Sequence, residues 1–173
     1  MKGKKTPAMS KIATRGAHVA VVRARWNENV TLGLERAALE RATANGASVE
    51  IFEVAGSFEL PAAIALLADT GRFDAIVPLG CLVRGETPHF EFLAHAIARA
   101  IAELSITYPI AIPFGVLTCD TIEQALARAG GAEGNKGAEF MDAALEMVAL
   151  RQAVASTTSR SRARRSASSR STR

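Results

Sequence analysis

Residues 75–105 limit the fold of this chain more than any other stretch, because they read as a strand, a loop and a helix in direct succession. The apolar run 75–79 has the length and composition of a buried strand. Glycines and a proline in 80–88 interrupt regular structure, and an apolar helix is predicted over 89–105. His89 therefore lies in the first turn of a helix that follows the carboxyl end of a strand. Ligands bind at this position in open α/β sheets.

The predicted helix 89–105 has apolar side chains around most of its surface. Its polar residues recur every four positions and form one narrow stripe, made of Glu91, His95, Arg99 and Glu103. A surface helix on a sheet needs only one apolar face. We expect one further side of this helix to be buried, most simply against a second copy of the chain. The alternative is a central helix in the core of a larger monomer.

Strand and helix patterns alternate along the whole chain. Strands are predicted at 18–22, 48–54, 75–79 and 110–117, and helices at 29–44, 61–69, 89–105, 122–129 and 138–151. Asn29 or Thr31 is expected to cap the first helix, and Thr118 or Asp120 the fourth. This alternation predicts an α/β layer structure on a mostly parallel sheet with right-handed crossovers. The loops at the carboxyl ends of the strands then meet at one edge.

The basic character of the chain lies in its two ends. The net charge is +4, but seven arginines and no acid follow position 150, and five basic residues precede position 16. The part between them holds nine basic residues against all 17 acids, which is a charge of −8. The pI therefore gives no reason to expect that the folded domain binds nucleic acid.

Length and composition predict one domain with two tails. We expect a flexible basic segment at 1–15, a folded domain at 16–151 and a disordered tail rich in arginine and serine at 152–173. The two cysteines, Cys81 and Cys119, are too few for a disulfide framework, so a reduced, cytoplasmic protein is the simplest interpretation. No apolar run approaches the length of a membrane span, about 18 residues.

His89 is the first candidate for chemistry. The positive end of the helix dipole disfavours imidazolium, and a neutral imidazole can transfer protons near pH 7. The alternative is a capping or structural histidine. His18, at the start of a strand, and His95, in the polar stripe, are weaker candidates.

The loop ahead of this helix can bind an anion. Free backbone N–H groups at Gly85, Glu86 and Thr87 can form such a site. The same residues would also be found in an ordinary tight turn that binds nothing. Arg128 is a second candidate ligand for phosphate, or else a solvated arginine at a helix end. Trp26 can stack on a planar ring or simply cover the edge of the core. The sequence shows no pattern of metal ligands and no dinucleotide fingerprint, so no cofactor is predicted.

Five segments in the same order resemble the 6,7-dimethyl-8-ribityllumazine synthase family of riboflavin biosynthesis. The resemblance covers residues 16–151, and its segments are 56–61 (GSFELP), 80–91 (GCLVRGETPHFE), 114–118 (FGVLT), 123–130 (EQALARAG) and 134–137 (GNKG). It implies a flavodoxin-like α/β/α sandwich on a four-stranded parallel sheet. It also implies pentamers, which in many members form a shell of 60 subunits, and chemistry without a metal or an organic cofactor.

The resemblance further implies a condensation of 5-amino-6-(D-ribitylamino)uracil with 3,4-dihydroxy-2-butanone 4-phosphate, with His89 as the proton-transfer residue. Phe114 would reach in from a neighbouring subunit, and Lys136 would lie close to the phosphate. Glu86, Thr87 and Arg128 would bind the butanone phosphate. The pyrimidine and its ribityl chain would be held by Trp26, Ser57, Phe58, Glu59, Cys81, Leu82 and Val83.

This chain departs from the family pattern at two positions. Trp26 stands where the family more often has phenylalanine, and Pro88 removes one backbone donor from the anion loop. The arginine-rich tail lies outside the pattern. Two other functions stay open at this stage. One is a flavin- or lumazine-binding protein without catalysis, and the other is a shell-forming scaffold whose basic tail recruits nucleic acid.

Overall fold

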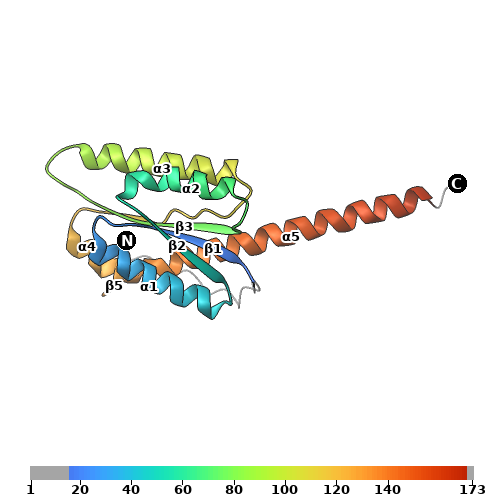
Figure 1. Cartoon of the computed structure of the whole chain (residues 1–173), viewed down its shortest axis with the longest axis horizontal. Helices are drawn as coiled ribbons and strands as arrows, with labels where there is room; N and C mark the ends of the chain where they lie inside the picture. The colour runs from blue at the N-terminus through green and yellow to red at the C-terminus, as the bar shows by residue number, and fades with distance from the viewer. Residues whose placement is uncertain (1–15, 171–173) are drawn as a thin grey trace.

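The computed structural model of the chain describes the backbone of residues 16–170 and the side chains of residues 16–157. Its middle layer is a four-stranded sheet in the order β2-β1-β3-β4, with every pairing parallel. The predicted three-layer, flavodoxin-like α/β/α sandwich is confirmed (Figure 1). The predicted N-terminal segment 1–15 lies outside the described residues. The strands are β1 (His18–Ala24), β2 (Ser48–Val54), β3 (Ala75–Val83) and β4 (Val116–Cys119).

Helices cover both faces of this sheet (Figure 1). On one side lie α1 (Glu28–Ala44), α4 (Ile122–Arg128) and the first part of α5 (Lys136–Arg170). On the other side lie α2 (Leu60–Asp69) and α3 (His89–Thr107). The strands serve both cores because successive side chains point to opposite faces. Two short elements complete the chain, namely the 3₁₀ turn η1 (Ser57–Glu59) and a hairpin of β5 (Ala129–Gly131) and β6 (Gly134–Asn135).

Both predicted helix caps are wrong. Helix α1 begins at Glu28, after Asn27 in a left-handed conformation (φ 58°), and the Asn27 side chain donates to the Cys81 carbonyl at 3.0 Å instead of capping. The Thr31 hydroxyl donates to the Ala24 carbonyl at 2.8 Å, inside the helix. Helix α4 is capped by Thr121, whose side chain accepts from the Gln124 N–H at 3.3 Å. Thr121, next to the expected Asp120, has the extended backbone of a capping residue, whereas α1 begins without a side-chain cap.

The fourth strand is shorter than predicted. Only Val116–Cys119 forms the β3 ladder, while Ala111 makes an isolated bridge to Ala75 further back. Pro113 has no N–H to donate to a ladder. Gly115 passes so close to β3 that a Cβ there would lie 1.9 Å from the Pro78 carbonyl oxygen. The segment therefore follows β3 along its length but pairs with it only at its two ends.

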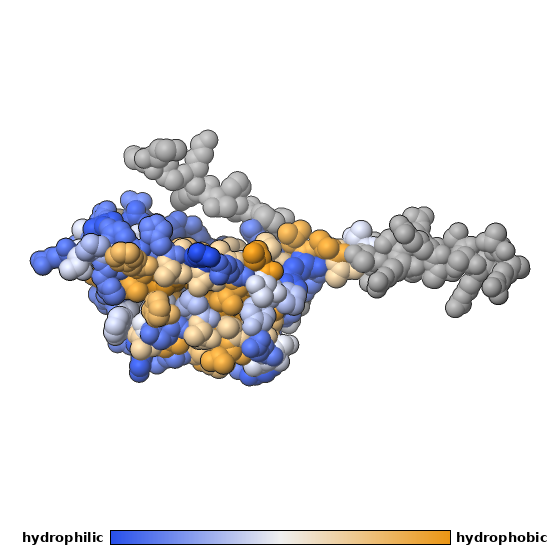
Figure 2. Space-filling model, turned by 90° about the horizontal axis from the view of Figure 1, so that it is seen from above, coloured by the Kyte–Doolittle hydropathy of each residue, from blue (hydrophilic) through white to orange (hydrophobic). Residues whose placement is uncertain are grey.

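Helix α3 begins at His89, as predicted, and leaves much apolar surface uncovered. Its fully buried residues are Ile97 and Ile101, which face the sheet and α2. Phe92 is 74% exposed and Ile106 is 85% exposed. Figure 2 views the molecule from the α3 side of Figure 1 and shows hydrophobic side chains among the hydrophilic ones on this face. The predicted second apolar side of this helix is thus present and open in the single chain.

Helix α5 continues past Arg151, where the sequence predicted its end, and projects away from the sheet (Figure 1). Its first turns are held by buried residues up to Val148. Side chains 152–157 are all exposed, and a helical segment without a packed face is marginally stable in water. Disorder of the segment 152–173 in solution stays a prediction.

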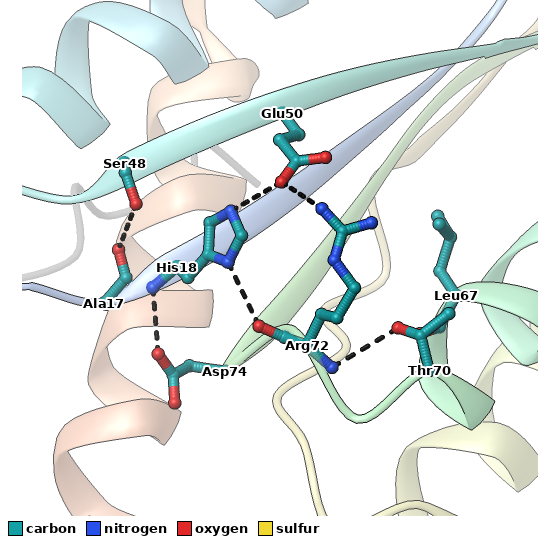
Figure 3. A network of polar contacts seen from close by, with 8 residues as sticks. All are labelled: Ala17, His18, Ser48, Glu50, Leu67, Thr70, Arg72 and Asp74. Atoms are coloured by element: carbon teal, nitrogen blue, oxygen red, sulfur yellow. Dashed lines mark hydrogen bonds and ion pairs between the residues drawn. The ribbon is translucent and has the colours of Figure 1, made fainter.

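The amino ends of the strands are tied together by a polar network (Figure 3). The His18 ring lies 2.9 Å from Glu50 through Nε2 and 3.1 Å from the Arg72 carbonyl through Nδ1. Arg72 also donates to Glu50 at 2.5 Å, and Asp74 accepts from the His18 backbone N–H at 2.9 Å. The weaker candidate His18 therefore has a structural place at the edge opposite the carboxyl ends of the strands.

Candidate active site

The loops at the carboxyl ends of β1, β2 and β3 are joined directly to one another. The backbone N–H groups of Arg25 and Trp26 donate to the carbonyls of Val54 and Ala55 at 2.9 and 3.0 Å. The Asn27 side chain reaches the Cys81 carbonyl. This bond ties the loop after β1 to the end of β3. The predicted meeting of these loops at one edge of the sheet is confirmed.

Trp26 and Phe58 present two open aromatic surfaces at this edge. Trp26 is 69% exposed and Phe58 is 59% exposed. The Trp26 indole stands against the backbone of Gly56, where a Cβ would lie 3.0 Å from Trp26 Cε3. A side chain at Gly56 would therefore crowd the ring and push it outwards. Two exposed aromatic rings can hold a planar heterocycle by stacking.

The polar groups behind these rings are already bonded within the chain. Glu59 Oε2 accepts from the Gly56 N–H at 2.9 Å, and the buried Ser57 hydroxyl accepts from the Cys81 N–H at 3.2 Å. Burial raises the pKa of the Cys81 thiol to about 12, with a further contribution from Cys119. Leu82 and Val83 follow at the end of β3 and are half-buried. This group forms a wall that fixes the loops in place.

The predicted anion loop is open to solvent. Glu86, Thr87 and His89 are all exposed, and His89 is the first residue of α3. At this helix end the free N–H groups and the dipole favour an anion. An imidazole here can reach a substrate without moving a buried side chain.

An ion-pair network anchors both ends of this loop. Arg84 pairs with Glu91 in the first turn of α3 and with Asp120 after β4, the latter at 2.7 Å. Its guanidinium also lies 4.5 Å from the centre of the Phe90 ring. The pKa of the Glu91 carboxyl is lowered, first by its own backbone N–H and then by Arg84. Arg84 thereby links the loops after β3 and β4.

Three further predicted residues gather elsewhere. Phe114, Arg128 and Lys136 line a cavity of about 410 Å³ along the free edge of β4. Arg128 donates to the Gln124 carbonyl at 2.9 Å, and Lys136 pairs with Glu139 at 2.7 Å. The lining of this cavity includes neither His89 nor Trp26. The single chain therefore divides the predicted site residues into two groups.

Several residues that shape these two groups were not among the sequence-predicted site residues. Asn27 and Arg84 act through contacts between distant segments, so no local pattern marks them. Glu139 lies three positions after Lys136 on the same helix, so its spacing could have marked it. Arg23 is buried beneath the Trp26 loop, one position past the predicted end of the first strand at 22. Among the described residues there is no cluster of three or more metal-ligating side chains. No helix in the same part of the chain is long and apolar enough to span a bilayer.

Comparison with known proteins yields one consistent result. The family model described as 6,7-dimethyl-8-ribityllumazine synthase matches residues 16–152. A protein of that name from Anaeromyxobacter dehalogenans (strain 2CP-C) is 42% identical over 144 residues, covering 81% of this chain and 88% of the relative. Another, from Anaeromyxobacter sp. (strain Fw109-5), is 43% identical over 148 residues, covering 83% of this chain and 90% of the relative.

Proposed function

Because the chain belongs to the 6,7-dimethyl-8-ribityllumazine synthase family, we propose that it is the transferase that makes 6,7-dimethyl-8-ribityllumazine in riboflavin biosynthesis. Its substrates are 5-amino-6-(D-ribitylamino)uracil and 3,4-dihydroxy-2-butanone 4-phosphate, and phosphate and water are released. The observation that carries this proposal is the family match over nearly the whole folded domain. No specific observation favours a protein without this activity.

We propose that the loops around Trp26 hold the pyrimidine. Trp26 and Phe58 offer exposed rings for stacking, and Glu59 holds the turn between them. Ser57, Cys81, Leu82 and Val83 form the wall behind. His89 moves protons as the amine joins the ketone, as phosphate leaves and as the ring closes. Holding two substrates together supplies much of the acceleration, so a modest contribution from one imidazole is sufficient.

We propose that the phosphate of the second substrate lies between the anion loop and the cavity group. Glu86 and Thr87 belong to the loop, and Arg128 and Lys136 to the cavity. The cavity that Arg128 and Lys136 line contains no residue of the anion loop, and this supports a site that a second copy of the chain completes. Phe114 would come from that neighbouring copy. Because Arg128 and Lys136 line the same cavity as Phe114, we propose that the same neighbour supplies them too.

The assembly that we propose is therefore a homo-oligomer, either a pentamer or a shell of 60 subunits. The uncovered apolar side of α3 supports this, because Phe92 and Ile106 are exposed in the single chain and their burial against a neighbour would be favourable. Both cysteines are free and buried. This is in keeping with a reducing compartment, and we propose the cytoplasm as the location of the enzyme.

Turnover of the two substrates by the purified protein tests the function. Lumazine fluorescence should appear on mixing them. His89→Ala should lower turnover by roughly ten- to a thousand-fold, at or below the lower end of general acid–base effects, because proximity remains. A native protein that binds both substrates and never forms lumazine would refute the enzymatic function. Full turnover in folded His89→Ala protein would refute the role of His89 alone.

The arginine-rich tail favours a second binding activity, towards nucleic acid. Residues 151–173 carry seven arginines and no acid. Such a segment binds phosphates without sequence preference and in a salt-dependent way. Removal of residues 156–173 should abolish retention of nucleic acid at low salt and leave lumazine formation unchanged. Equal retention with and without these residues would show that the tail has another role.

A further inference from the structure

Arg23 is a buried cation directly beneath the loop that carries Trp26. The residue is only 5% exposed and is the next-to-last residue of β1. Its Nε donates to Glu35 at 2.9 Å, one terminal nitrogen lies 3.4 Å from Glu28, and the other contacts Glu53. Glu28 and Glu35 belong to α1 and Glu53 to β2. One planar guanidinium, which has five donors in a fixed fork, thus joins three elements.

These contacts fix the Trp26 loop from both sides. On the strand side, Arg23 stands opposite Glu53 in the β1–β2 register. The same ladder continues through Arg25 and Trp26 to the loop after β2. On the helix side, Glu28 is the first residue of α1, two positions after Trp26. The loop 25–27 therefore has both of its ends attached to the same guanidinium.

The indole lies largely at the surface. Trp26 is 69% exposed, and its ring stands against the backbone of Gly56, in the loop after β2. Asn27 adopts φ 58°, a left-handed conformation that asparagine tolerates better than most residues, and its side chain is held by the Cys81 carbonyl. The place of the ring over Gly56 thus depends on the spacing between the β1 and β2 loops. The backbone bonds from Arg25 and Trp26 hold these loops together, and the Arg23–Glu53 pair is the side-chain contact between the same two strands.

A contribution to stability alone does not explain an arginine here. Buried ion pairs are weak contributors, and apolar residues of similar volume often stabilise a protein as well or better. The neighbouring strand residues Val19 and Val21 are apolar and fully buried on this face. What arginine adds over valine or methionine is a directional contact to three carboxylates at once.

We propose that Arg23 is a positioning residue, which sets the orientation of Trp26 by clamping β1, β2 and the start of α1. The expected effect on substrate binding rests on the proposed role of Trp26 as the stacking surface for the pyrimidine. The expected effect on the motion of the indole does not depend on that role. Loss of the clamp should free the indole to move and should weaken binding of 5-amino-6-(D-ribitylamino)uracil more than binding of the butanone phosphate.

The fluorescence of Trp26 tests this directly, because it is the single tryptophan of the chain. Time-resolved anisotropy of the full-length, ligand-free protein should show restricted motion of the native indole. Arg23→Lys keeps the charge but not the fork, and it should increase the fast component of the decay. Arg23→Met should also increase the fast component of the decay. It leaves the mostly buried Glu35 without its partner, which can prevent folding. Glu53→Gln, which removes a half-exposed partner only, is the second variant that stays informative if Arg23→Met does not fold.

Arg72→Gln is the matched control. Arg72 also joins a glutamate of β2, Glu50, but at the amino ends of the strands (Figure 3). Arg72→Gln should leave the Trp26 anisotropy unchanged. In turnover, Arg23→Lys should raise the KM for the pyrimidine by about tenfold to a hundredfold. It should leave the KM for the butanone phosphate within about twofold of native.

Two results would overturn the inference. One is an unchanged anisotropy decay in folded Arg23→Lys and Glu53→Gln proteins. The other is an equal gain of motion in Arg72→Gln, which would mean general loosening of the domain. Greater Trp26 motion with an unchanged pyrimidine KM would support the positioning of the ring by Arg23 and would refute the proposed stacking role of Trp26.

Discussion

Replacement of Phe92 by glutamate should separate the subunits of the proposed assembly and leave each subunit folded. Phe92 is 74% exposed in the single chain and does not belong to either hydrophobic core. Aromatic side chains bury about 150–250 Å², so roughly 150 Å² of Phe92 is available to a neighbour. At about 25 cal/mol per Å², full burial contributes about 4 kcal/mol per subunit, an upper bound. This corresponds to between two and three orders of magnitude in the association constant.

The measurement is the mass in solution at micromolar concentration, by light scattering or sedimentation, combined with lumazine formation. Native protein should have a mass several times that of one 18.2 kDa chain. Phe92→Glu should shift the mass towards the single chain and reduce turnover with it, because the proposed site needs two copies. Phe92→Ala should do so less strongly.

Arg36→Gln is the control, since it changes the charge by the same amount at an exposed position of α1, on the other face of the sheet. A circular dichroism melt shows whether each variant is folded. A native protein that is fully active at the mass of one chain would refute the reasoning. So would a Phe92→Glu protein with native mass.

Three further predictions follow from particular contacts. Arg128→Ala should raise the KM for the butanone phosphate and affect the pyrimidine less, and equal small effects on both would mean that Arg128 is only a surface residue. Cys81 and Cys119 should not react with a disulfide reagent at pH 8 in the native protein, because burial raises both thiol pKa values, that of Cys81 to about 12. Both should react once guanidinium unfolds the chain, and rapid native labelling would contradict this. The pKa of Glu91 is lowered from its ordinary value of 4.5 by its own N–H and by Arg84, so its stabilising effect is complete above that value and is lost as the pH falls through the lower, folded-state pKa. The melting difference between native and Glu91→Gln protein should shrink over that acidic range, and a constant difference would argue against it.

The sequence was sufficient for the order and the layers of the fold. The centre of β1 (residues 19–22) and the whole of β3 are apolar runs, and Pro61 marks the first turn of α2 as expected. The fourth strand was predicted too long because periodicity cannot show that Pro113 and Gly115 leave the ladder. The helix caps failed for a similar reason. Asn27 is held by the carbonyl of Cys81, 54 residues away, and local propensity contains no such contact.

The candidate site was predictable only through its motifs. Trp26, His89 and the anion loop follow from the rule that ligands bind at the carboxyl ends of parallel strands. Arg23 and Arg84 do not follow from it, since each pairs with carboxylates from two other segments that meet only in the folded chain. Glu139, which pairs with Lys136 in the cavity beside β4, is different, because the two residues are three positions apart on one helix and their spacing could have marked the pair.

The two surfaces that the single chain leaves unfinished have a common explanation. One is the apolar side of α3, where Phe92 and Ile106 meet water. The other is the cavity along the free edge of β4, which holds Phe114 and two cations away from the loops that carry His89. The two surfaces belong to different parts of the chain, so a neighbour that covers one can present the other to a third copy. Contacts of this head-to-tail kind generate rings when the rotation closes. A ring of identical subunits would bury α3 and bring the cavity of each copy to the loops of the next, which is why we expect assembly and activity to be lost together.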